Sequence, residues 1–305
     1  MLKKAIFLLL IPAAALIFNG CDGCSGNKTK GDGLTEVDTD DVQLELGEDI
    51  MSNVIQNISS PVEMANMIKS SGVAFSQKIL NNPDIVSKYE TSFQKALNLG
   101  VFSSDLGYIN IFDKNNIVVS YLLAAKTLAD GLRVGQFFDY EALRNVATSQ
   151  SNLEELMEMS ISSFNKIDYY LREQNRSEVS TLIITGAWVE GMYLSAMVYK
   201  EAKNKQMADR IAEQKHVVEI LEIVLDNFKS HPGFPALVEG ISELSSAYNS
   251  IRITTEYGEP ERIEKDGTLI IVQAEISTAH YEDDDIDKII NKIVEIRTEI
   301  TKTAE

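Results

Sequence analysis

The chain has 305 residues, of which 44% are hydrophobic, and its formal net charge at pH 7 is −18. Such an acidic chain is not expected to bind nucleic acid or to hold anionic lipid by charge, because both contacts need basic patches. Cys21 and Cys24 are its two cysteines, so the roughly 280 residues after them must fold by packing alone.

Residues 1–20 have the pattern of a secretory signal. Two lysines precede the uncharged run 5–18, which is shorter than the about 20 residues that a spanning helix needs. The segment ending in Gly20 and Cys21 resembles a lipobox, although the two positions before Gly20 depart from the usual residues. Lipid on Cys21 would anchor the protein stably. The alternative is an ordinary cleaved signal that leaves Cys21 as a thiol.

The residues after Cys21 indicate a tether. Residues 21–47 are rich in polar residues, and 32–49 contain eight acids and no base. Segments with so little apolar surface stay extended. We therefore expect a cell-envelope protein held by a lipid, most simply at the outer membrane, with either membrane face possible and Cys24 lacking a partner within the chain.

The rest of the chain, 48–305, is predicted to be a single, mostly α domain. A helical bundle or a repeat-like array of antiparallel helices is expected, since capping residues precede runs with helical periodicity. Gly100 is expected to end the second helix, and 101–113 to be a short helix or a compact loop. The predicted helices begin at Ser60 and then span 82–100, 116–134, 140–148, 151–173, 177–203, 205–229 and 235–250.

The last part of the chain changes character. Asp266-Gly267 lies between two apolar segments, which indicates a β-hairpin. Asp283 to Asp285 then provide caps for a terminal helix, so the region 260–302 is predicted as a hairpin plus a helix. That helix should dock on the bundle through isoleucines at helical spacing, namely Ile286, Ile289, Ile290, Ile293, Ile296 and Ile300.

An internal duplication is predicted. Residues 116–164 and 177–228 match at offsets of 60 and then 64, and each copy has an acid followed by glycine, at Asp130 and Glu190. Repeated helical units bury their faces against one another. Chance similarity between amphipathic helices is the alternative. Asp130 lies on a polar helical arc and is interpreted as a surface acid.

Glu190 is the principal candidate for a functional residue. It is the only charged residue from Val179 to Tyr199, and a helix that is apolar on all sides is usually central. A buried carboxylate needs a partner or takes up a proton. A structural role would pair Glu190 with a tyrosine, a backbone group or a basic residue of a neighbouring helix. A transmembrane role is disfavoured, since a central Glu costs about 2.5–3.5 kcal/mol.

The alternative role of Glu190 is in a ligand pocket. Four side chains of one helix, Glu190 included, would line it. The cluster 102–108 would form its mouth, or would instead be a turn with Asp105 as a cap. The candidate residues are Trp188, Glu190, Tyr193, Met197, Asp105 and Tyr108. The favoured function is then a non-enzymatic module that binds an envelope protein or a small ligand.

An enzyme is the second hypothesis. The three histidines are too far apart in the sequence to suggest a metal site, and no phosphate loop, nucleophile elbow or paired-cysteine motif is present. We therefore assign no catalytic residue, metal or cofactor. A hydrolase or metal-dependent enzyme would need Asp105, Glu190 and His216 to converge in one cleft.

Several short segments resemble an uncharacterised family of helical Bacteroidota lipoproteins. They are Ser104 to Tyr108, Leu128 to Gly131, Gly135 to Asp139 and Gly186 to Gly191. The resemblance implies a cell-envelope location over most of the chain after the tether. It implies no substrate and no catalytic residue.

Overall fold

The computed structural model describes residues 68–148, 153–265 and 268–303. The described residues belong to one compact unit, Gln43–Glu305. Cys21, the signal, the tether and the capping box at Ser60 lie outside them, so those predictions stay predictions.

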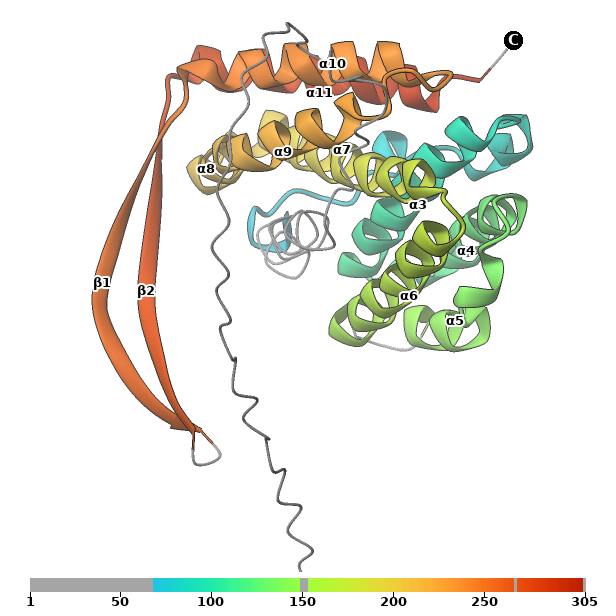
Figure 1. The fold of residues 1–305 in the computed structure, drawn as a ribbon, viewed down its shortest axis with the longest axis horizontal. Helices are drawn as coiled ribbons and strands as arrows, with labels where there is room; N and C mark the ends of the chain where they lie inside the picture. The colour runs from blue at the N-terminus through green and yellow to red at the C-terminus, as the bar shows by residue number, and fades with distance from the viewer. Residues whose placement is uncertain (1–67, 149–152, 266–267, 304–305) are drawn as a thin grey trace, which may run out of the picture. The chain divides into compact units, whose positions relative to one another are not determined.

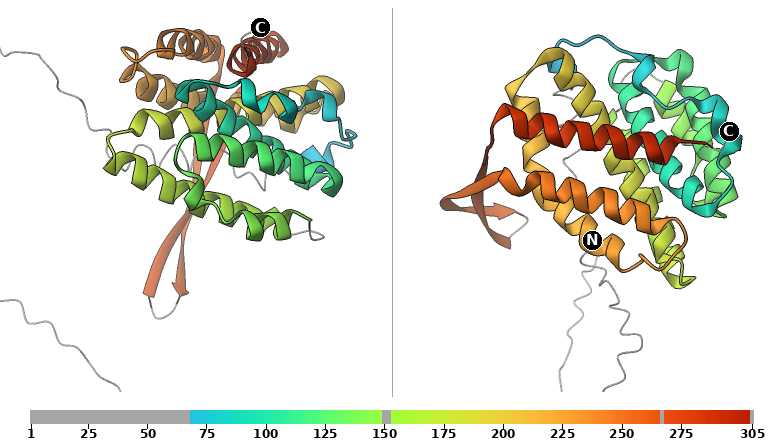
Figure 2. Two further views of the ribbon diagram at one scale, coloured as in Figure 1. Left: turned by 90° about the vertical axis from the view of Figure 1, so that its right-hand side faces the viewer. Right: turned by 90° about the horizontal axis from the view of Figure 1, so that it is seen from above.

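The fold is mostly α, as predicted, with one antiparallel hairpin before the terminal helix (Figures 1 and 2). Short 3-10 helices lie at Gln77–Ile79, Pro83–Lys88, Gly135–Phe137 and Tyr248–Ser250. The longer elements are α3 Ser92–Ile111, α4 Asn115–Gly131, α5 Tyr140–Thr148, α6 Leu153–Glu173, α7 Ser177–Ala202, α8 Lys205–Glu213, α9 Lys215–Asp226, α10 Phe234–Ala247, β1 Arg252–Lys265, β2 Thr268–His280 and α11 Asp283–Thr301.

The helix α7 occupies the centre of the core. Seventeen of its residues are buried, and α3, α6, α8, α9 and α11 all contact it. Among the described helices, α7 alone is long and apolar enough to cross a membrane, and 78% of its most apolar window is buried inside the protein.

The crossing of α3 and α7 corrects the prediction for Gly100. Gly100 lies in the middle of α3 rather than at a helix end. A Cβ on Gly100 would collide with the carbonyl of Ile183, and one on Gly186 would collide with the carbonyl of Leu97. Glycine is therefore required here for close backbone approach, which the sequence pattern does not distinguish from a helix stop. The predicted start of this helix at Asn82 is also wrong, because Asn82 caps only the 3-10 helix Pro83–Lys88. The helix α3 begins after Thr91, with Gln94 completing a capping box.

A second correction concerns the predicted helix 205–229. It is broken at Gln214 into α8 and α9. Gln214 is buried and accepts a hydrogen bond from Trp188 Nε1 at 3.1 Å. The two predicted duplicated units nevertheless share an order of elements, since α4, α5 and α6 in the first correspond to α7, α8 and α9 in the second. Duplication itself stays a prediction.

The C-terminal helix docks as predicted, with all six isoleucines of its stripe buried. Before it, β1 and β2 pair from Arg252 with His280 to Lys265 with Thr268, and the register shifts between Tyr257 and Pro260. The base of this hairpin is tied to the helices, because Lys215 donates to the carbonyl of Ile251 at 2.8 Å.

Candidate functional site

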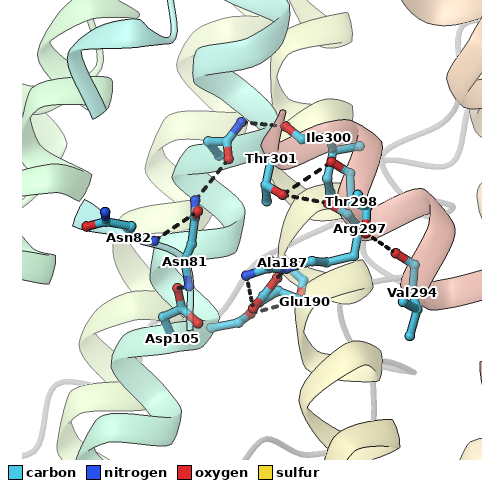
Figure 3. Close-up of polar contacts among 12 residues, drawn as sticks. Asn81, Asn82, Asp105, Ala187, Glu190, Val294, Arg297, Thr298, Ile300 and Thr301 are labelled. Atoms are coloured by element: carbon cyan, nitrogen blue, oxygen red, sulfur yellow. Dashed lines mark hydrogen bonds and ion pairs between the residues drawn. The ribbon is translucent and has the colours of Figure 1, made fainter. Parts of the chain in front are cut away.

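Three ionisable side chains meet where α3, α7 and α11 cross (Figure 3). Arg297 donates from Nε to Glu190 Oε2 at 2.9 Å and from Nη2 to Oε1 at 3.2 Å. Asp105 lies against the same carboxylate, and neither acid has any exposed surface. Such two-point contacts between arginine and carboxylate are strong and geometrically specific. Glu190 therefore has the kind of partner that its structural role requires, a basic residue of a neighbouring helix.

The surroundings of this acid pair indicate which of the two carboxyl groups carries a proton. Burial raises the pKa of both carboxyls, and the negative charge of Glu190 raises the pKa of Asp105 further. Arg297 opposes the rise mainly at Glu190, through its charge and its hydrogen bonds. Asp105 is therefore the neutral acid and Glu190 the carboxylate. Asp105 then donates a hydrogen bond to the Glu190 carboxylate.

Buried amides connect this cluster to the end of α11. The backbone N–H of Asn81 donates to Asp105 Oδ2 at 3.1 Å, and its side chain donates to Asn98 Oδ1 at 3.2 Å. Asn98 in turn donates to the carbonyl of Ile300 at 2.8 Å, and Tyr89 to that of Thr301 at 3.2 Å. These contacts satisfy two of the carbonyls that a helix C-terminus leaves unpaired.

Tyr193 completes the cluster from α7. The Arg297 guanidinium lies over the Tyr193 ring, 4.6 Å from its centroid. A cation held over an aromatic face is attracted by the ring. Arg297 is thus held by a carboxylate on one side and a ring on another, and its side chain keeps 14% exposure.

The other predicted pocket residues lie in separate places. Trp188 is bonded to Gln214, as described above. Tyr108 accepts from the backbone of Ser76 at 3.3 Å and stacks on Phe75 with ring centroids 5.5 Å apart. Met197 packs partly buried against the core. Of the six predicted pocket residues, the structure therefore brings Asp105, Glu190 and Tyr193 together.

His216 does not join the two acids. Its side chain is 70% exposed on α9, and its Nδ1 lies 3.5 Å from Glu219. Within the described residues, no group of three His, Cys, Asp or Glu side chains is arranged to hold a metal ion. Asp130 is a surface acid as interpreted, 52% exposed and paired with Lys126 at 2.6 Å.

Sequence reasoning missed Arg297 and the two asparagines. A signal for Arg297 was present, since it continues the helical spacing of Ile286, Ile290 and Ile293. A basic residue on a buried stripe needs an acid on the facing helix. No comparable signal marks Asn81 or Asn98, whose burial depends on the packing of distant segments.

A surface hollow lies apart from this cluster. Its volume is about 440 Å³, and it opens between the 3-10 helix 135–137 and α6. It is lined by Phe137, Asn165, Lys166, Tyr169, Tyr170 and Glu173.

Comparisons with protein-family models, with curated proteins and with solved structures find no match to this chain. The interpretation of both places therefore rests on their geometry.

Proposed function

We propose that this protein is a non-enzymatic cell-envelope lipoprotein, anchored through lipid on Cys21, that binds a partner protein with its hairpin. The observation that carries this proposal is the hairpin itself. In the described part of the chain, β1 and β2 form a two-stranded sheet without a third strand. Such a ribbon has two open backbone edges and is marginally stable alone, whereas pairing with an extended segment of a partner would complete it.

The two strands differ in a way that selects the binding edge. The sequence of β1 includes seven charged residues and Pro260, which has no N–H to donate. The sequence of β2 includes one residue that is charged at pH 7 with histidine neutral, Glu275, and the apolar run 269–272. Charges and proline guard an edge against pairing. The partner is therefore an extended segment of low charge that adds to β2.

The buried acids support a non-enzymatic role. Asp105 and Glu190 have no exposed surface, and they bond to each other, to the backbone of Asn81 and to Arg297. Because a general acid or base must reach its substrate, this cluster is a structural element of the three-helix junction.

The anchor is tested by fractionation of cells. Cys21→Ser should move the protein out of the detergent-extracted membrane fraction or leave it as an uncut precursor, and the matched Cys24→Ser should leave its distribution unchanged. Mass spectrometry of the N-terminal peptide should find acyl chains on Cys21. An unmodified, soluble wild-type chain would contradict the proposal.

The binding edge is tested with three baits in envelope extract. They are the wild-type chain, a chain in which a short Gly-Ser link replaces 253–279, and Ile223→Ser, which alters an exposed apolar residue of α9. The link is possible because Arg252 and His280 are paired neighbours. A partner should be retained by the first and third baits, lost by the second, and photo-cross-linked from position Gln273 rather than from Glu261. The same proteins on all three baits would refute the proposal.

A further inference from the structure

The exposed face of α6 combines a ring, a hollow and two opposite charges. Tyr169 is 63% exposed, while the neighbouring Tyr170 packs on Phe137 with centroids 5.0 Å apart. Lys166 and Glu173 are exposed and line the same hollow. Together with Asn165 these residues are called the α6 patch.

The order of these residues is self-complementary. Lys166 precedes the midpoint between Tyr169 and Tyr170 by as many residues as Glu173 follows it. If two α6 helices lie antiparallel about a two-fold axis through that midpoint, Lys166 of each copy faces Glu173 of the other. The exposed Tyr169 ring then faces the Tyr170–Phe137 side of the partner's hollow. Two-fold contacts of this kind use the same patch on both copies.

The α6 patch differs in charge from the chain as a whole. Copies with a net charge of −18 repel one another over most of their surfaces. The α6 patch carries one base and one acid and is neutral, so it permits close approach where general contact is disfavoured. Aromatic side chains at its centre supply the apolar contact that such interfaces need.

We propose that the α6 patch is a self-association surface at which two copies of this chain pair antiparallel about an axis between Tyr169 and Tyr170. This pairing goes beyond the hairpin function and does not depend on it, because β1 and β2 take no part. Helices in contact lie about 8–10 Å apart, which is close enough for Lys166 and Glu173 to form ion pairs across the axis. The contact is small and should be in rapid exchange between monomer and dimer.

The test is sedimentation equilibrium of the full chain, purified in a density-matched detergent, over a range of concentrations. Lys166→Glu and Glu173→Lys each replace two attractive pairs of the dimer with two repulsive ones. Each should weaken dimerisation about tenfold or more. The double variant should restore the wild-type constant, and an equimolar mixture of the two single variants should associate more tightly than either single variant does alone. Lys229→Glu, an exposed change on another face, is the matched control and should leave dimerisation unchanged.

These outcomes separate the proposal from its alternatives. A wild-type chain that stays monomeric at every concentration would overturn it, as would single variants that dimerise like the wild type. Failure of the double variant to recover would overturn the two-fold register. Circular dichroism of each variant checks that these exposed substitutions leave the helical content unchanged.

Discussion

Replacing Glu190 by glutamine isolates the energetic role of the buried ion pair. Glu190→Gln keeps the size of the side chain and removes the charge that faces Arg297. Breaking a buried ion pair from one side costs about 3–5 kcal/mol. Because Arg297 keeps 14% exposure, water relieves part of this cost, and we expect the lower end of that range. With a urea dependence of about 3 kcal/mol per molar, the unfolding midpoint should fall by about 1 M.

The matched variant is Asp105→Asn, which tests the assigned proton. An amide at this position still donates to Glu190 and still accepts from the backbone of Asn81. At pH 7 this variant should be at least as stable as the wild type, because the unfolded wild-type chain gains free energy by ionising Asp105 and an asparagine has no proton to release. Asp130→Asn, at an exposed ion pair, should cost about 1 kcal/mol or less. Urea unfolding at pH 7 followed by circular dichroism measures all three variants. Equal losses for Asp105→Asn and Glu190→Gln would refute the assignment of the proton to Asp105.

The pH dependence provides a second check on the same proton. The pKa of Asp105 is raised by burial and by Glu190 from its ordinary value of 3.8. Above that value the unfolded chain releases a proton that the folded chain keeps, so this residue makes the free energy of unfolding decrease as pH rises toward the raised value. Asp105→Asn has no proton to release and should remove this contribution. Unfolding free energies of the two chains should therefore diverge as the pH rises above 4, until the raised pKa is reached; parallel curves would contradict the shift.

Further predictions concern packing in the described helices. Gly100→Ala should destabilise the protein by about 2–3 kcal/mol, because the added methyl meets backbone at Ile183; Gly191→Ala, where a Cβ meets nothing within 4 Å, should stabilise it by about 0.5–1 kcal/mol. The urea unfolding midpoint should therefore fall for Gly100→Ala and rise for Gly191→Ala, and shifts of the same sign would contradict this reasoning. Tyr248→Phe should cost about 1 kcal/mol through loss of the 2.8 Å bond to the carbonyl of Ile211, and an unchanged midpoint would contradict this.

Local pattern was sufficient for the type of most elements. The isoleucine stripe predicted α11 and its docking, and Asp266-Gly267 between apolar segments predicted the hairpin. Both signals depend on neighbouring residues alone, since side-chain periodicity and turn geometry are local properties of the backbone. The same reasoning placed Glu190 in the centre of the domain and required a partner for it.

Tertiary packing decided which residues pair with the buried polar side chains and where helices end or continue. Arg297 is 107 residues from Glu190 in the chain, and Asn98 reaches a carbonyl 202 residues away. A glycine is needed at position 100, inside α3, because the backbone of α7 crosses there too closely for a Cβ. By itself, the sequence determined which segments are helical or extended and which acid must be compensated inside the domain. Which residue compensates it, and where a glycine permits a crossing rather than ending a helix, depends on contacts between distant segments, and these contacts exist only once the helices are packed.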